Sequence, residues 1–153
     1  MSRRGDKLLI SNRRARHDYH VLEAFECGIV LFGAEIKSLR EGRANLQDAH
    51  ARVEGGEVWL HGMHVSPYAF SRGDLDPVRK RKLLLHRRQI DRLLGAVQRE
   101  GATVVPLRLY FNERGIAKLL LGLARGKRKQ DKREAEKRRD WERERGRLIR
   151  AKG

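Results

Sequence analysis

The sequence predicts a mainly β body with flanking helices, followed by a basic C-terminal tail that is disordered when free. Three observations lead to this fold class: several apolar segments of strand length, one clear amphipathic helix, and a last 30 residues almost without apolar side chains. Short strands capped by helices favour a small closed or partly open β-barrel. Another α+β arrangement stays open, because periodicity does not define how strands close on one another.

The first half of the body reads as strands around one short helix. Glu23–Leu31 is a strand candidate, and Ala34–Glu41 is a short helix that ends at Gly42. Arg52–His61 has the pattern of a β-hairpin, with Gly55-Gly56 at its centre, where a tight turn needs positive φ.

The second half opens with the helix that the sequence indicates best, Arg87–Glu100. Its apolar side chains recur at i, i+3, i+4 and i+7 on a single face: Ile90, Leu93, Leu94 and Val97. Gly101 follows as a suitable C-terminal stop. We expect this helix to cap the strands.

A second hairpin completes the body. Thr103–Phe111 alternates two sets of side chains, Asn112–Gly115 forms a loop, and Ile116–Leu123 returns as a strand. Pro106 cannot donate a backbone hydrogen bond, so it predicts an edge or bulged position within the first of these strands.

The composition changes after this hairpin. Residues 1–123 hold 22 basic and 14 acidic side chains and nearly all of the aliphatic and aromatic ones, whereas residues 124–153 hold 14 basic and 6 acidic ones. A segment so poor in apolar groups buries too little surface to offset its ordering entropy. We therefore expect a body over residues 1–123 and a tail over residues 124–153. Asp131–Ile149 is rich in good helix formers, so this part of the tail either stays a solvated basic segment or becomes helical when an RNA surface neutralises it.

The charge balance restricts the partners. The 153 residues include 36 Lys and Arg against 20 Asp and Glu, a formal net charge of +16. A polyanion is the natural counterpart, because phosphate contacts release condensed counterions. No segment approaches the ~20 apolar residues of a membrane span, and Met1–Lys7 lacks the apolar core of a signal peptide. The single cysteine, Cys27, fits the reducing cytoplasm and the role of a small buried hydrophobe.

The sequence gives no support for catalysis or for a cofactor. His17 and His20 are three residues apart, as are His61 and His64, but neither pair lies on a predicted helix and Cys27 has no neighbouring cysteine. No nucleophile elbow or phosphate-binding glycine loop is present. We therefore expect a protein without enzymatic activity, metal or cofactor.

Basic side chains with aromatic neighbours favour RNA as the partner. Two clusters stand out: Arg13, Arg14, Arg16, His17 and Tyr19 before the first strand, and Arg79, Lys80, Arg81 and Lys82 before Leu83. Arginine and aromatic planes stack on unpaired bases, and lysine and arginine contact phosphates. Each cluster alone is also compatible with an ordinary charged surface.

Five segments, in order, carry a resemblance to a known family. They are NRRARHDY (Asn12–Tyr19), FECGIVL (Phe25–Leu31), GAEIKSLREGRANLQDAH (Gly33–His50), RKLLLH (Arg81–His86) and GLARGKRKQDKRE (Gly122–Glu134). Together they resemble the SsrA-binding protein family, or small protein B, over nearly the whole chain.

The resemblance implies a function as well as a fold. It implies an oligonucleotide-binding-type β-barrel that holds the tRNA-like domain of transfer-messenger RNA, and a monomeric protein. The tail is implied to enter the empty messenger path and decoding centre of a stalled ribosome, which then tags the incomplete peptide in trans-translation. Chemistry is left to the ribosome and alanyl-tRNA synthetase, and elongation factor Tu assists delivery.

The resemblance also assigns residues. Glu26, Leu84 and Lys118 match the RNA-contacting barrel surface, and a carboxylate there accepts hydrogen bonds from base amino groups. Further RNA contacts are implied, with a purely structural role as the equal alternative, for Arg16, His17, Lys37, Arg40 and Asn45. The ribosome-contacting tail residues implied are Gly126, Lys127, Gln130, Asp131, Lys132, Arg133, Trp141, Leu148 and Ile149. Gln130 departs from the histidine that is usual in the family, which removes an aromatic face for stacking.

Two other classes of protein remain open at this stage. A ribosomal protein with a basic extension fits the composition equally well. An RNA-processing enzyme, with His17 and Asp18 as a proton-transfer pair, is the weaker alternative.

Overall fold

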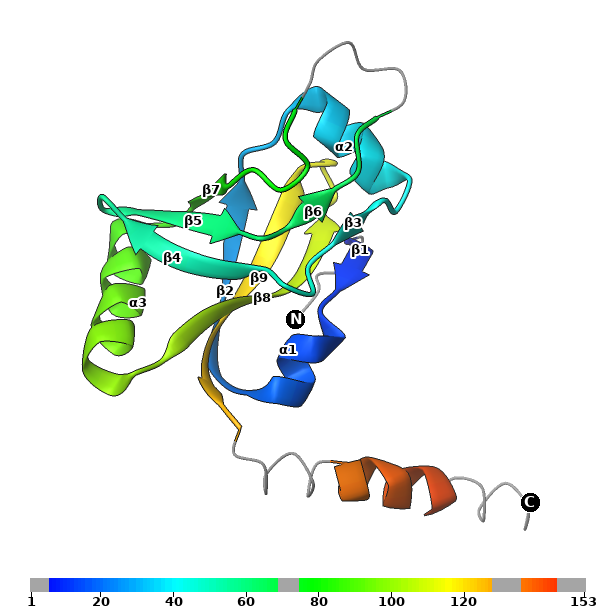
Figure 1. Cartoon of the computed structure of the whole chain (residues 1–153), viewed down its shortest axis with the longest axis vertical. Coiled ribbons are helices and arrows are strands. Elements are labelled where there is room, and N and C mark those ends of the chain that lie inside the picture. Colours follow the sequence, from blue (N-terminus) through cyan, green and yellow to red (C-terminus); the bar gives the residue numbers. More distant parts are fainter. Residues whose placement is uncertain (1–5, 69–74, 128–135, 146–153) are drawn as a thin grey trace.

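A seven-stranded antiparallel sheet forms the body of the part of the chain that the structure describes (Figure 1). The computed structural model describes residues 6–68, 75–127 and 136–145. The strand order is β1-β8-β9-β2-β7-β5-β4. The strands are β1 (Lys7–Ser11), β2 (Tyr19–Ile29), β4 (His50–Glu54), β5 (Glu57–His61), β7 (Arg81–Leu84), β8 (Thr103–Phe111) and β9 (Ala117–Gly126). A separate pair joins β3 (Ala44–Asn45) to β6 (His64–Val65).

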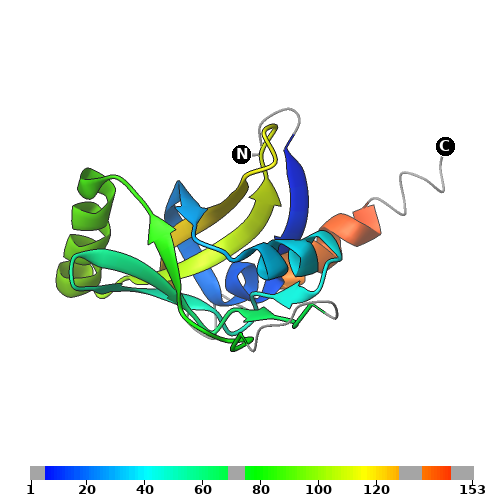
Figure 2. The same ribbon diagram turned by 90° about the horizontal axis from the view of Figure 1, so that it is seen from above.

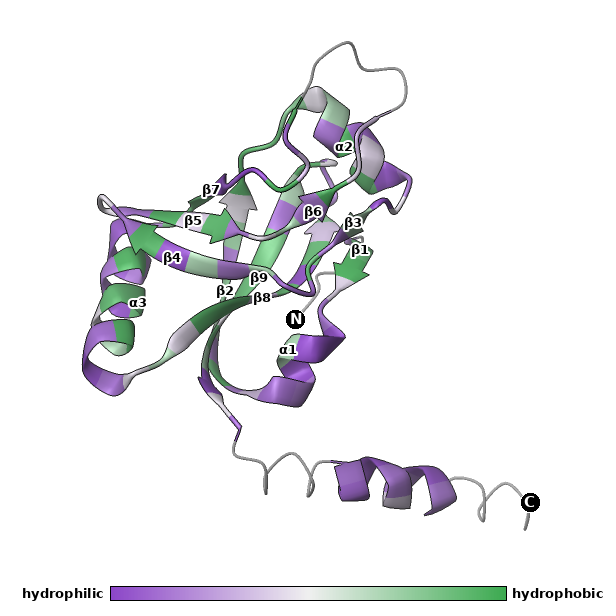
Figure 3. Ribbon diagram, viewed as in Figure 1, coloured by the Kyte–Doolittle hydropathy of each residue, from purple (hydrophilic) through white to green (hydrophobic). Residues whose placement is uncertain are grey.

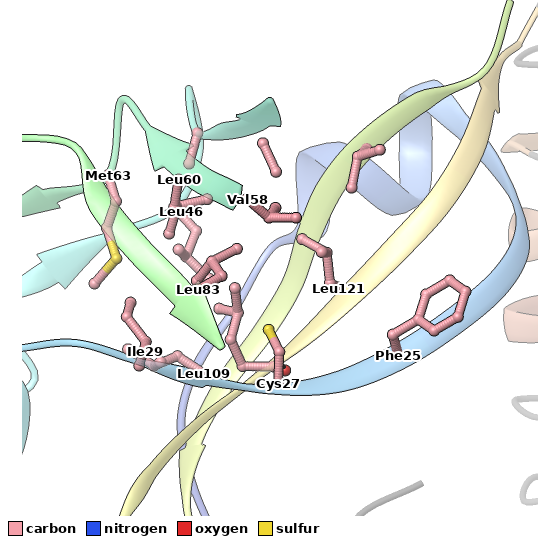
Figure 4. Close-up of a cluster of buried hydrophobic side chains, with 14 of the residues drawn as sticks. Phe25, Cys27, Ile29, Leu46, Val58, Leu60, Met63, Leu83, Leu109 and Leu121 are labelled. Carbon is pink, nitrogen blue, oxygen red and sulfur yellow. The ribbon is translucent and has the colours of Figure 1, made fainter. Parts of the chain in front are cut away.

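The large sheet curls around the core until its far strand, β4, packs against β8. These two strands are not neighbours in the hydrogen-bonded order, so the barrel is partly open. Its interior is filled by inward-facing side chains from several strands (Figure 4), among them Cys27, Leu60, Leu83, Leu109 and Leu121, each at most 2% exposed. The mainly β, barrel-like fold class predicted from the sequence is confirmed.

Helices flank this barrel. They are α1 (Arg13–Asp18), α2 (Gly33–Arg40) and α3 (Arg87–Glu100), and residues 136–145 are also helical. The two views in Figures 1 and 2 place α2 and α3 on opposite sides of the body. The prediction for α3 is confirmed to the residue: Leu93 is buried in the core and Gly101 ends the helix in a left-handed conformation, φ 65°.

Two predicted strands are longer or shifted in the structure. β2 covers Tyr19–Ile29 instead of Glu23–Leu31, and β9 covers Ala117–Gly126 instead of Ile116–Leu123. They pair with each other along most of their length, out to Tyr19 opposite Gly126. Ala124 is fully buried in a small cluster with Ala15, so the ladder continues past the change in composition. An alanine is too small an apolar side chain for the sequence pattern to indicate a buried strand at Ala124.

The bulge predicted at Pro106 is confirmed. β8 lies between β1 and β9, and the register with β9 shifts between Pro106 and Arg108. Asn12 provides donors for two backbone carbonyl groups at the bulge. Its N–H donates to Leu107 O at 2.8 Å, and its Nδ2 donates to Pro106 O at 2.9 Å. A proline inside the sheet is thus tolerated where a buried asparagine replaces ladder bonds.

The tail is described only in part. Residues 136–145 form an exposed helix with almost uniformly hydrophilic colouring (Figure 3), inside the range predicted to be helix-forming. Trp141 is 60% exposed on it. Six predicted tail residues lie outside the described residues: Gln130, Asp131, Lys132, Arg133, Leu148 and Ile149. Within the described ranges, no helix is long and apolar enough to cross a membrane.

Candidate nucleic-acid interface

Three side chains that the sequence assigned to RNA binding line one surface hollow. Glu26 comes from β2, Leu84 from β7 and Lys118 from β9, and the hollow has a volume of about 600 Å³. The first residues of α3 and the loop before it close one side, with His86, Gln89 and Ile90. Strands far apart in the sequence therefore deliver a carboxylate, an apolar group and an ammonium group to one place.

A glycine forms the floor of this hollow. Gly28 of β2 lies directly opposite Lys118 on one side and Leu84 on the other. A Cβ at Gly28 would lie 3.2 Å from the Cβ of Leu84, closer than most side-chain contacts. The same Cβ would lie 3.3 Å from Leu84 Cδ1, so the absence of a side chain at Gly28 leaves room for the Leu84 side chain over the floor of the hollow.

A buried tyrosine holds the carboxylate of the hollow. Tyr110 lies opposite Lys118 on β8, is 4% exposed, and donates its hydroxyl hydrogen to Glu26 Oε2. Burial, followed by the hydrogen bond and the charge of Glu26, raises the pKa of Tyr110, so the phenol stays protonated and remains a donor. Glu26 itself is exposed. One carboxylate oxygen is thus fixed, and the other is left to accept from a ligand.

The remaining groups of the hollow have distinct properties. Lys118 is half-buried and forms no ion pair among the described residues, whereas Lys82 at the rim is 2.8 Å from Glu57. Leu84 is 53% exposed, so its apolar side chain is open to solvent at the hollow. Cys27 lies under the floor, and burial raises its pKa to about 12. The predicted role of Cys27 as a buried hydrophobe is confirmed.

Comparison with known proteins identifies the family. The sequence model of the family described as "SmpB protein" matches residues 9–151. This chain belongs to the SmpB family.

Relatives within the SmpB family cover almost the whole chain. The "SsrA-binding protein" of Chelativorans sp. (strain BNC1) is 57% identical over 143 residues, 93% of this chain and 92% of the relative. That of Caulobacter vibrioides is 54% identical over 144 residues, 94% of this chain and 95% of the relative. A chain of 54% identity in the solved structure "tmRNA-SmpB: a journey to the center of the bacterial ribosome" superimposes with a TM-score of 0.66, covering 82% of this chain and 92% of that one.

Two other predicted contacts of this SmpB family member lie on α1, outside the hollow. Arg16 is exposed, and the ring of His17 lies between two carboxylates, with Nδ1 2.9 Å from Asp18 Oδ1 and Nε2 2.7 Å from Glu136 Oε1. The hydrogen bond to Glu136, followed by that to Asp18, raises the pKa of His17. Lys127 donates its backbone N–H to Asp18 O at 2.8 Å and its Nζ to Arg16 O at 3.1 Å. These contacts therefore attach the first residues of the tail to α1.

A third region lies on α2 and the short β3. Lys37 Nζ is 5.2 Å from the centroid of the Tyr68 ring, and Arg40 Cζ is 5.7 Å from that of Phe111. Both cations are exposed. The side chain of Asn45 accepts a hydrogen bond from the Gln47 N–H at 2.6 Å, which is a local turn contact. The structure thus does not bring the eight predicted RNA contacts together, because they occupy three separate regions.

The members of the predicted basic cluster at residues 79–82 differ in how far they are buried. Arg81 is 0% exposed, forms an ion pair of 2.7 Å with Glu35 and donates Nη1 to Met63 O at 2.7 Å. Its assignment as a phosphate contact is wrong, because a fully enclosed guanidinium cannot reach RNA. Arg79 also binds Glu35, whereas Lys80 and Lys82 remain at the surface.

This buried network has a defined electrostatic state. Burial favours a higher pKa for Glu35, but hydrogen bonds from Arg79, the Phe32 N–H and Arg81 more than offset it and hold the pKa below its usual range. The carboxylate therefore stays ionised and joins α2 to β7. In the part of the chain that the structure describes, no group of three or more potential metal ligands is found.

Proposed function

We propose that this chain binds transfer-messenger RNA through the hollow and delivers it to stalled ribosomes for trans-translation. The observation that carries the proposal is the convergence of Glu26, Leu84 and Lys118 around Gly28. Membership of the SmpB family and relatives named SsrA-binding proteins support the identity of the RNA. A solved chain of 54% identity, described with tmRNA and the bacterial ribosome, supports the site of action.

The chemistry of the hollow suits an unpaired nucleotide of the tRNA-like domain. Leu84, whose side chain lies over Gly28, offers an apolar surface to the face of a base. The free oxygen of Glu26 accepts from a base amino or imino group, and Lys118 neutralises a neighbouring phosphate. RNA is read best where its bases are unstacked, so a loop of the tRNA-like domain is the suitable ligand.

The tail acts separately in this proposal. Gly126 and Lys127 are held by β2 and α1, so the tail leaves the barrel at a defined point. Its basic segment, which includes Gln130, Asp131, Lys132 and Arg133, enters the empty messenger path near the decoding centre. Trp141, Leu148 and Ile149 supply apolar contacts there. The division into an RNA-binding body and a ribosome-reading tail belongs to this proposal.

The protein has the role of a cytoplasmic, monomeric adaptor in this account. It performs no reaction and needs no cofactor, because the ribosome and alanyl-tRNA synthetase supply the chemistry and elongation factor Tu assists delivery. A basic surface suits this role, since phosphate contacts strengthen association and make it sensitive to salt.

The test is a gel-shift titration with transfer-messenger RNA against bulk tRNA at fixed salt. We expect a strong preference for transfer-messenger RNA, and a loss of about 1–3 kcal/mol of binding free energy in Glu26→Ala or Lys118→Ala. Lys7→Ala is the matched control, because it removes the same charge from the exposed edge strand β1, and Lys7 does not line the hollow. Equal affinity for both RNAs, or equal effects of Lys7→Ala and Lys118→Ala, would falsify the proposal.

A further inference from the structure

The outer face of the sheet continues beyond the hollow, from β7 onto β5 and β4. Val58 and Leu60 of β5 are 1% and 0% exposed in the core, so Trp59 between them points to the outer face. Trp59 lies directly opposite Lys82 on β7 and Arg52 on β4. Lys82 also lines the hollow, which makes the two surfaces continuous.

Three cationic side chains lie over or beside Trp59: Lys80, Lys82 and Arg52. Lys80 Nζ lies 4.5 Å from its centroid and 3.2 Å from Glu54 Oε2. Arg52 is exposed and forms no ion pair within residues 6–68, 75–127 and 136–145. Two residue pairs further along, on the same face, the rings of His50 and His61 stack with centroids 5.6 Å apart and planes at 15°. The face thus combines flat rings with positive charge and is bounded by the carboxylates of Glu54 and Glu57.

We propose that Trp59, together with Arg52 and Lys80, forms a base-stacking platform for a second unpaired nucleotide of the RNA bound in the hollow. This inference rests on the proposed function. Aromatic rings beside cations are the usual means by which proteins hold unpaired nucleotides, because every base has a face that can stack and every nucleotide has a phosphate.

The relative strengths of the two interactions favour replacement of Lys80 by a base over the Trp59 ring. Stacking of a base on an aromatic side chain is generally stronger than a single cation over a ring at an exposed site. Lys80 leaves the ring when the base arrives, and its ammonium group then contacts the phosphate of the same nucleotide. Arg52, on the other side of Trp59, contacts the next phosphate or stacks on the base edge. The ion pair between Lys80 and Glu54 is exposed and opposes this change only weakly.

Tryptophan fluorescence tests the platform in the full-length chain. The sequence holds two tryptophans, Trp59 and Trp141, so Trp141→Phe leaves Trp59 as the only reporter. Titration of this variant with transfer-messenger RNA is expected to quench its emission in parallel with the gel shift. Unchanged emission at saturating RNA overturns the platform, and the gel shift in the same samples still reports on the hollow.

A second measurement separates stacking from a structural role. Trp59→Leu should weaken RNA binding by about tenfold, and Trp59→Phe, which keeps a ring, should weaken it less. Both affinities are compared with that of the Trp141→Phe chain, the common background of the fluorescence titration. An affinity loss in Trp59→Leu without quenching of native Trp59 overturns the proposal, because Trp59 would then act only through the sheet. Failure of the unaltered protein to bind the RNA would instead refute the proposed function.

Discussion

At the residue scale, one side chain of the hollow is held by a partner that lies far away in the sequence. Tyr110 is buried and Glu26 is exposed, yet the hydroxyl of the first orients the carboxylate of the second. A surface carboxylate normally samples several rotamers. Restriction to one rotamer in the complex costs entropy and therefore weakens binding. In the proposed function, Tyr110 is therefore a positioning residue that orients Glu26 before the RNA arrives.

Removal of the Tyr110 hydroxyl is expected to weaken RNA binding through Glu26. Tyr110→Phe keeps the buried ring and should reduce the binding free energy by about 1 kcal/mol, the value of one hydrogen bond. In a Glu26→Ala background the same substitution should have no further effect, because its partner is absent. Gel-shift titrations of the two single variants and the double variant measure this coupling. Additive losses would show that Tyr110 acts independently of Glu26.

The sequence indicated some of these residue roles and not others. Glu26, Leu84 and Lys118 were assigned by resemblance, and the structure places them in one hollow. The alternation in Thr103–Phe111 separates Tyr110 from Leu109 and Phe111, but it does not reveal a partner 84 residues away. Arg81 was mistaken for a surface cation, because its neighbours are basic and Glu35, which neutralises it, is 46 residues distant.

At the scale of elements, α2 is attached to β7 by a buried charge network. Glu35 of α2 receives hydrogen bonds from Arg79 and from Arg81, whose side chain is fully enclosed. A guanidinium in such a place is tolerated only while its counter-charge is present. The network therefore makes the position of α2, with its exposed Lys37 and Arg40, dependent on one carboxylate.

Stability should depend on the ionisation of Glu35. Its pKa is lower in the folded chain than its ordinary value of 4.5, so this stabilisation is present above that pH and is lost as the pH falls through the folded pKa. Glu35→Gln should lower the free energy of unfolding by about 3–5 kcal/mol at neutral pH and flatten its decline in acid.

Urea denaturation at neutral and acidic pH measures both effects. Glu57→Gln is a suitable control, because the ion pair of Glu57 with Lys82 is 45% exposed on the carboxylate side and contributes at most about 1 kcal/mol. Similar losses in the two variants would contradict the role assigned to the buried network.

Helices and strands were predictable where their own sequence carries a clear apolar pattern. α3 and β8 match their predicted bounds because a helical apolar face with Gly101, and a long alternating apolar run, are encoded locally. α1 and β7 were missed because Arg13–Asp18 and Arg81–Leu84 are short and read as charged clusters. Their structure depends on partners elsewhere in the sheet, which a local pattern does not record.

At the scale of the whole molecule, the proposed function places RNA recognition and ribosome sensing in different parts of the chain. The candidate RNA groups of the hollow belong to β2, β7 and β9, whereas much of the positive charge lies beyond the last strand. The contacts of Lys127 with Asp18 and Arg16 join these parts at one place beside α1. The two activities should therefore be separable by truncation.

Truncation after Arg128 should separate RNA binding from peptide tagging. The truncated chain keeps every strand that the structure describes and the contacts of Lys127. Its affinity for transfer-messenger RNA should therefore stay within about tenfold of the full chain at physiological salt, with a smaller salt dependence. Tagging on stalled ribosomes should be abolished. Tagging by the truncated protein in a reconstituted translation assay would mean that the tail supplies only general attraction to RNA.

The burial of the only cysteine has a practical consequence for experiments on this protein. With a pKa raised to about 12 by burial and 2% exposure, the thiol of Cys27 is almost wholly protonated at neutral pH. Alkylating dyes and mild oxidants react with thiolates, so they will leave the native chain nearly untouched. A cysteine introduced on the exposed helix at residues 136–145 will carry a probe at a single defined site, without removal of Cys27 from beneath the hollow.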